Sequence, residues 1–210
     1  MKKGLTELVF ILDRSGSMAP LTEDTIGGFN AMIAKQKKEE GECLVSTVLF
    51  ANDSAVIHDR LPLAEVPDLT DRDYCAGGCT ALLDAVGTSI RHIETIHRYA
   101  RPEDVPERTL FVITTDGMEN ASHRFTGKEV RDLVEKMKKE KAWDFIFLAA
   151  NIDAAEAAGH IGIAPDRAMN YSANKEETGR LYRRIGRTVA AARACAPQAD
   201  MTAALKDDIE

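Results

Sequence analysis

The sequence alternates short apolar runs with longer amphipathic segments, and this alternation restricts the folds that it can adopt. Four nearly continuous apolar runs are predicted strands: Leu8–Leu12, Leu44–Phe50, Leu110–Thr114 and Phe145–Ala149. Such uniformly apolar strands are typical of parallel sheets, because helices cover both faces of those sheets. The alternation therefore predicts an α/β fold with a doubly wound, mostly parallel sheet and helices on both faces.

Two further segments are expected at the edges of this sheet. Ala55–His58 follows Leu44–Phe50 after a link that is too short for a crossover helix, which predicts an antiparallel hairpin. Arg167–Tyr171 is predicted to form a short last strand at an edge. The expected sheet thus has six strands, one of which is antiparallel.

Helices are predicted where apolar residues recur at steps of three and four. Four sets show this period: Ile26, Phe29 and Ile33; Leu82, Val86, Ile90 and Ile93; Val130, Leu133, Val134 and Met137; Leu181, Tyr182, Ile185, Val189 and Ala192. Capping boxes are expected at three helix starts: Thr126 with Glu129, Asp153 with Glu156, and Asn174 with Glu177. The 210 residues suit one large domain, predicted over residues 1–195, with 196–210 as a tail or short helix.

Oxygen-bearing side chains stand where predicted strands end and where one helix begins. Asp13, Ser15 and Ser17 follow the first strand, Thr80 comes after a glycine pair, and Asp116 follows another strand. Open α/β sheets bind ligands beyond the carboxyl ends of their strands, where the strand order reverses. Mg²⁺ prefers oxygen ligands, and two carboxylates roughly neutralise it. These five residues therefore predict one metal site that leaves a coordination position for an outside oxygen.

The same segments resemble the metal-ion-dependent adhesion site (MIDAS) of von Willebrand factor type A (vWA) domains. The matching stretches are Phe10–Met18, Gly77–Leu82 and Thr115–Gly117, within a resemblance that covers roughly residues 5–195. The resemblance implies the strand order 3-2-1-4-5-6 and a site that holds Mg²⁺, or Mn²⁺ or Ca²⁺ in its place. It also implies that the carboxylate of a partner protein completes the coordination.

The resemblance is nearest to the bacterial intracellular members of the vWA family, which implies a cytoplasmic location. Some of those members lie beside AAA-type ATPases or stress-resistance systems, which are therefore possible partners by resemblance. The rim that faces such a partner is predicted to include Met18, Gly78, Glu119 and Asn120, because these residues belong to the metal loops or follow them. His123 lies near this rim and is expected to be an exposed loop histidine.

The motifs predict a metal-dependent protein-binding module rather than an enzyme, because no catalytic constellation accompanies the metal residues. The alternative is a magnesium-dependent phosphatase or other hydrolase that uses Asp13 as its nucleophile. The haloacid-dehalogenase pattern would require a second aspartate two residues later, where this chain has Ser15. The sequence has neither the glycine motif of dinucleotide-binding folds nor a P-loop, so those functions are not expected.

Charge and hydropathy exclude two other classes of partner. The formal net charge of −7 argues against general nucleic-acid binding. The apolar runs are too short to span a bilayer, so no membrane insertion is expected. Unpaired thiols are expected for the cysteines in a reducing cytoplasm, and a disulfide between Cys75 and Cys79 is the open alternative.

Overall fold

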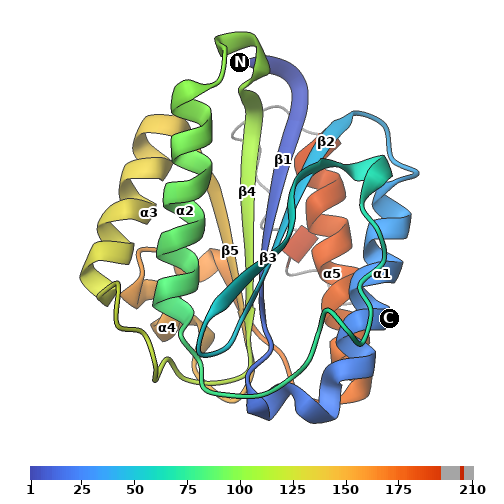
Figure 1. Ribbon diagram of the computed structural model, residues 1–210, viewed down its shortest axis with the longest axis vertical. Coiled ribbons are helices and arrows are strands. Elements are labelled where there is room, and N and C mark those ends of the chain that lie inside the picture. The colour runs from blue at the N-terminus through green and yellow to red at the C-terminus, as the bar shows by residue number, and fades with distance from the viewer. Residues whose placement is uncertain (195–203, 206–210) are drawn as a thin grey trace.

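The computed structural model describes residues 1–194 and 204–205, and a six-stranded sheet forms its centre (Figure 1). The spatial order is β3-β2-β1-β4-β5-β6. Only β2 and β3 pair antiparallel, so the predicted order, hairpin and doubly wound sheet are confirmed. The strands are β1 (Lys2–Asp13), β2 (Glu42–Phe50), β3 (Ser54–Pro62), β4 (Pro106–Thr115), β5 (Asp144–Ala149) and β6 (Ala168–Asn170).

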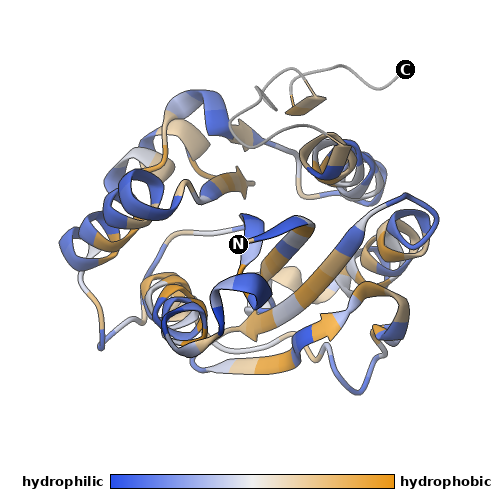
Figure 2. Cartoon of the chain, turned by 90° about the horizontal axis from the view of Figure 1, so that it is seen from above, coloured by the Kyte–Doolittle hydropathy of each residue, from blue (hydrophilic) through white to orange (hydrophobic). Residues whose placement is uncertain are grey.

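In the described residues, five α-helices cover the sheet in two layers. The view along the strands shows these layers (Figure 2). One layer, formed by α1 and α5, packs on even-numbered β1 residues such as Phe10. The other layer, formed by α2, α3 and α4, packs on odd-numbered residues such as Ile11. The alternation of β1 side chains between the two cores follows from the pleat of the strand. The helices are α1 (Thr22–Gln36), α2 (Leu82–Tyr99), α3 (Gly127–Lys141), α4 (Ala154–His160) and α5 (Lys175–Ala194).

The predicted helix caps are confirmed only in part. Thr126 and Glu129 form both halves of a capping box at the start of α3. Asp153 and Asn174 accept hydrogen bonds from the expected backbone N–H groups, of Glu156 and Glu177 respectively. The carboxylate of Glu177 instead pairs with Arg180 at 2.6 Å, so the reciprocal half predicted there is wrong.

The positions of β1 and β4 determine where a ligand can bind. These central strands run parallel, with Leu12 beside Thr114, so Asp13 and Asp116 follow neighbouring strand ends. The chain leaves β1 toward the layer of α1 and leaves β4 toward the layer of α3. The strand order therefore reverses between β1 and β4, which is the ligand-binding position of open α/β sheets.

Two expectations concern the rest of the molecule. The predicted tail, 196–210, lies outside the described residues except for Ala204 and Leu205, and Leu205 is buried against the α1–α5 core. None of the helices in the described part of the chain combines the length and the apolar character that crossing a bilayer requires.

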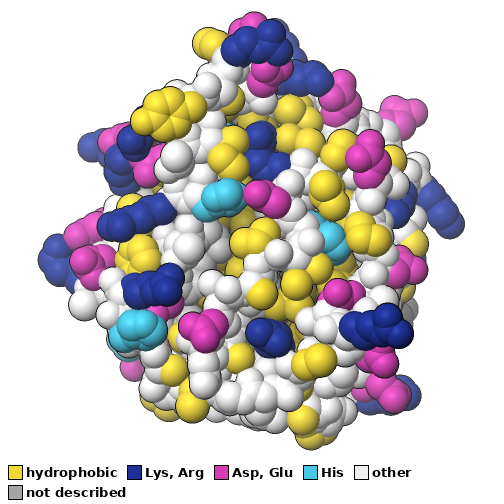
Figure 3. All heavy atoms as spheres, in the orientation of Figure 1, with side chains coloured by type: hydrophobic (Ala, Val, Ile, Leu, Met, Phe, Trp, Pro, Cys, Tyr) yellow, Lys and Arg dark blue, Asp and Glu magenta, His cyan; other side chains and the backbone are white. Residues whose placement is uncertain are grey.

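The face that carries α2 and β3 shows acidic and basic side chains interspersed rather than one charged patch (Figure 3).

Candidate functional site

Hydrogen bonds of the main chain hold the loop after β1 against the loop before α2. Gly16 N–H donates to the carbonyl of Gly78 at 3.0 Å, and Gly77 N–H donates to the carbonyl of Arg14 at 2.8 Å. Gly78 has φ +83°, a backbone conformation that favours glycine. A methyl group at this position would lie 2.6 Å from Oδ1 of Asn52, which accepts the N–H of Cys79. The glycine is therefore needed for the backbone conformation of the loop before α2 and for its contact with Asn52 in the turn after β2.

Asp13 is fixed by donors on both of its carboxylate oxygens. Its Oδ1 accepts from Ser15 N–H at 2.7 Å, and its Oδ2 accepts from the Thr115 hydroxyl at 2.7 Å. The Tyr74 hydroxyl donates to the backbone carbonyl of the same residue. Asp13 is only 1% exposed, so this carboxylate is held rigidly beneath the loops rather than in bulk solvent.

Two serine hydroxyls connect the Asp13 loop to Asp116. Ser17 Oγ donates to Asp116 Oδ1 at 2.6 Å, and the Ser15 and Ser17 hydroxyls lie 3.1 Å apart. Burial raises the pKa of Asp116 above its usual range, and the charge of Asp13 raises it further, against the lowering effect of the two hydroxyls. The four predicted ligands Asp13, Ser15, Ser17 and Asp116 thus form one connected group in which two carboxylates repel each other.

Backbone hydrogen bonds connect Thr80 to Asn120, in the loop that follows Asp116. Its N–H donates to the side-chain oxygen of Asn120 at 2.9 Å, and its carbonyl accepts from the Asn120 N–H at 3.0 Å. Thr80 is 4% exposed, and Gly78, two residues earlier, contacts the Asp13 loop. The loop of Thr80 therefore lies between the loops of Asp13 and Asp116, as the proposed grouping requires.

The structure gives the four predicted rim residues different roles. Gly78 and Asn120 are exposed and join neighbouring loops. Met18 is only 4% exposed and packs in the α1–α5 core, because the 3-10 turn Gly16–Leu21 directs it inward. Met18 is therefore not part of an exposed rim.

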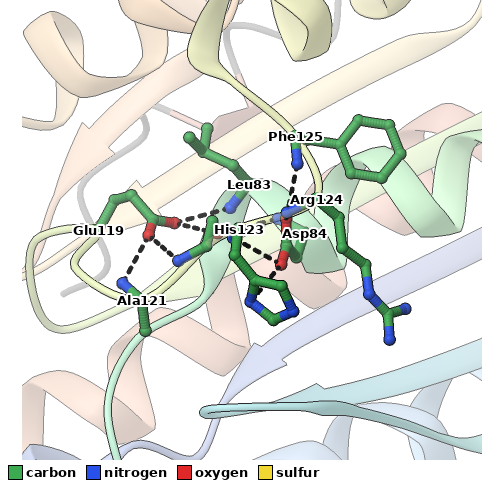
Figure 4. A network of polar contacts seen from close by, with 8 residues as sticks. Leu83, Asp84, Glu119, Ala121, His123, Arg124 and Phe125 are labelled. Atoms are coloured by element: carbon green, nitrogen blue, oxygen red, sulfur yellow. Dashed lines mark hydrogen bonds and ion pairs between the residues drawn. The ribbon is translucent and has the colours of Figure 1, made fainter.

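Glu119 fixes the conformation of the loop after β4, so its carboxylate is not free to bind a partner. It accepts N–H groups from Leu83, Ala121 and Ser122 at 2.7–2.9 Å, as well as the Ser122 hydroxyl (Figure 4). These bonds tie the loop after β4 to the first turn of α2, where backbone N–H groups lack partners within the helix. The side chain of Glu119 is consequently occupied by the protein itself.

Asp84 is a second carboxylate that fixes the loop after β4, and the sequence did not predict this role. Its carboxylate accepts N–H groups from His123, Arg124 and Phe125 at 2.9–3.0 Å (Figure 4). Burial alone would raise the pKa of Asp84, but these three donors outweigh it and lower the pKa. The only signal in the sequence is an acidic residue in the first turn of a helix. His123 is exposed, as predicted.

The site contains carboxylate and hydroxyl oxygens but no cluster of classical metal ligands. In residues 1–194 and 204–205, no three His, Cys, Asp or Glu side chains come together in a group that could hold a metal ion. The grouping described above has two carboxylates only, and its remaining side-chain donors are hydroxyls. Cys75 and Cys79 are exposed free thiols in the loop before α2.

Solved structures show what this fold resembles, although no family model and no curated protein matches the chain. Proximal thread matrix protein 1 from the mussel byssus has a TM-score of 0.62 and 14% identity over 89% of this chain and 46% of its own. A von Willebrand factor type A protein from Catenulispora acidiphila has a TM-score of 0.57 and 13% identity, and the match covers 86% of this chain and 41% of the Catenulispora chain. Manganese-loaded TRAP protein from Plasmodium vivax has a TM-score of 0.56 and 14% identity, and the match covers 86% of this chain and 72% of the TRAP chain.

These likenesses concern architecture. This chain spans less than half the length of the mussel and Catenulispora chains. The shared features are the six-stranded sheet with one antiparallel strand and the helices on both faces. At such low identities the comparison establishes the fold alone, and the protein has the fold of von Willebrand factor type A domains.

Proposed function

We propose that this protein is a divalent-metal-dependent protein-binding module. Asp13, Ser15, Ser17, Thr80 and Asp116 would hold Mg²⁺, with Mn²⁺ or Ca²⁺ able to take its place. The bound ion would supply a Lewis-acidic position that accepts an acidic side chain of a partner protein. The observation that carries the proposal is the pair of buried carboxylates, Asp13 and Asp116. The Ser15 N–H bonds to Asp13, and the Ser15 and Ser17 hydroxyls continue the connection to Asp116.

The donor set fits such an ion on grounds of charge. Two buried carboxylates repel each other, and the raised pKa of Asp116 reflects that cost together with burial. A divalent cation would neutralise both, whereas neutral hydroxyls add ligands without adding charge. A mussel protein of the same fold has a zinc-occupied MIDAS motif, and the Plasmodium protein is manganese-loaded, which supports a divalent ion here.

A binding role is favoured over the hydrolase alternative by the surroundings of Asp13. An aspartate nucleophile of the haloacid-dehalogenase kind needs a second aspartate two residues later, and that position is Ser15. The Ser15 hydroxyl lies 3.1 Å from that of Ser17, which donates to Asp116, so it belongs to the predicted ligand group. We therefore propose a non-enzymatic module. By resemblance we place it in the cytoplasm, with an AAA-type ATPase or a stress-resistance protein as the class of partner.

Calorimetric titration of Mn²⁺ and Mg²⁺ into chelator-treated protein tests the metal site. We expect one binding site, loss of binding in Asp13→Asn and in Asp116→Asn, and weaker binding in Thr80→Ala. Asp59→Asn is the matched control, because Asp59 is exposed and pairs with His92 away from the strand ends. Absence of binding by the unaltered protein, or equal binding by Asp116→Asn, would refute the proposal.

A further inference from the structure

We infer that the partner segment carries a large apolar side chain close to its acidic residue, and that this side chain enters a pocket beside the metal site. The inference rests on the proposed function and specifies the chemistry of its ligand. A basic residue is expected beyond the apolar one. The pocket has a volume of about 510 Å³ and lies between the first turn of α2, the loop after β4 and α4.

The lining of this pocket is mainly apolar. Its apolar side chains are Leu82, Leu83, Met118, Ile152, Ala157 and Ile161. Pockets that bind side chains or small ligands are typically apolar with a few polar groups at the edge. A leucine or methionine side chain that left water for such a lining would contribute favourably to binding.

Direct contacts connect the pocket to the metal residues. Asn151 lines the pocket, and its Nδ2 donates to the backbone carbonyl of Asp116 at 3.0 Å. Met118 also lines it and follows Asp116 by two residues, which limits their Cα separation to about 7.6 Å. A peptide that reaches both positions in extended form therefore needs its apolar residue roughly two to four positions from its acidic residue.

The side chain of Met118 is exposed to solvent, although hydrogen bonds fix the loop that carries it. Its exposed fraction is 72%, whereas the next residue, Glu119, is fixed by three backbone N–H donors. Three other large apolar side chains are comparably exposed in the described residues, namely Met1, Val56 and Tyr99, and none of them lines this pocket. An anchored loop that presents an exposed methionine next to a binding position is typical of an interaction surface.

The charges at the pocket edge determine which residue can accompany the apolar one. Glu119, Asp153 and Glu156 all line the pocket, and the last two are exposed on the α4 side. This negative edge disfavours a second acidic residue and favours lysine or arginine. The partner's acidic residue is therefore directed to the cation, and its basic residue is directed to α4.

Short immobilised peptides in a glycine-serine background provide the test. One set has an aspartate with a leucine two, three or four positions away on either side, followed by a lysine. Matched sets replace the leucine with serine or the aspartate with asparagine. In the presence of Mg²⁺ we expect a peptide with both residues to bind about tenfold more tightly than its serine counterpart, and chelator to remove the binding.

Two variants separate the pocket from the metal site. Ala157→Phe fills the pocket from α4 and Met118→Ser removes the apolar side chain at its edge without adding charge. Both variants should lose the preference for leucine with unchanged Mg²⁺ affinity. Tyr99→Ser is the control for loss of an exposed apolar side chain outside this pocket. Mg²⁺ binding without a leucine preference, or a preference that survives Ala157→Phe, would overturn this inference alone. Absence of Mg²⁺ binding by the unaltered protein would overturn the proposed function as well.

Discussion

Strand β1 buries two carboxylates on the same face of the sheet, one near its middle and one at its carboxyl end, and their surroundings differ. Glu7, near the middle, is 0% exposed and contacts Arg60 and His97, each at 2.5 Å. Asp13, at the carboxyl end, is 1% exposed and lies near Asp116, and no described residue forms an ion pair with either aspartate. The chain neutralises the first carboxylate itself, and we propose that a cation from outside neutralises the second pair.

The largest effect is expected from Glu7→Gln. This change removes the negative charge between Arg60 and His97 and leaves their buried polar groups without a matching partner, at a cost of about 3–5 kcal/mol in unfolding free energy. Urea unfolding measures this loss, and Glu42→Gln is the control because its ion pair with Lys2 is exposed. A loss below about 1 kcal/mol would mean that the two buried carboxylate positions of β1 do not differ as described.

The second prediction concerns the effect of metal on stability. Mn²⁺ at a hundred times its dissociation constant should raise the unfolding free energy by about 2.7 kcal/mol. The same increment should appear in Glu7→Gln and disappear in Asp116→Asn. Thermal unfolding with and without chelator measures this difference. An increment that survived in Asp116→Asn would show that the cation binds elsewhere.

The third prediction tests the role of Gly78 in the loop before α2. Gly78→Ala should destabilise the protein by about 1–2 kcal/mol and weaken metal binding, because φ is +83° and the new methyl group would displace Asn52. Gly77→Ala is the matched neighbour, since a methyl group there meets nothing within 4 Å. Equal effects of the two substitutions, in unfolding and in metal titration, would argue against a special role of Gly78.

The smallest effect is a pH dependence that involves neither of the two buried carboxylate positions of β1. Burial lowers the pKa of His58, whose ring lies 3.0 Å from the Thr47 hydroxyl. A lowered folded-state pKa means that stability is complete above the unfolded value near 6.5 and decreases as pH falls below it. His58→Gln should flatten the pH dependence of unfolding between pH 7.5 and 5.5 relative to the unaltered protein. An unchanged slope in His58→Gln would assign the effect to another group.

Much of the fold could be predicted because its signals are local. The apolar runs marked the strands of the sheet interior, and the short link after Leu44–Phe50 marked the hairpin. The motif residues Asp13, Ser15, Ser17 and Asp116 could be grouped because each follows a predicted strand end. Local patterns thus contained both the architecture and the position of the candidate site.

The parts that sequence reasoning missed depend on contacts between distant segments. Glu7 interrupts an apolar run. The residues next to it in the sequence do not indicate its contacts with Arg60 and His97, which are 53 and 90 residues away. Arg60 has φ +51° beside irregular pairing of β2 with β3, and no local pattern shows this. Met18 follows the motif directly, yet a single 3-10 turn buries it. Such outcomes follow from tertiary packing and not from residue type.

The central claim is that the carboxylates of Asp13 and Asp116 share one divalent cation. Anomalous diffraction from a crystal soaked in Mn²⁺ tests it most directly. The account predicts one strong peak between these carboxylates and the Ser15 and Ser17 hydroxyls, and no peak at Glu7. A manganese-soaked crystal without a peak at that position, or with its peak among other residues, would contradict it.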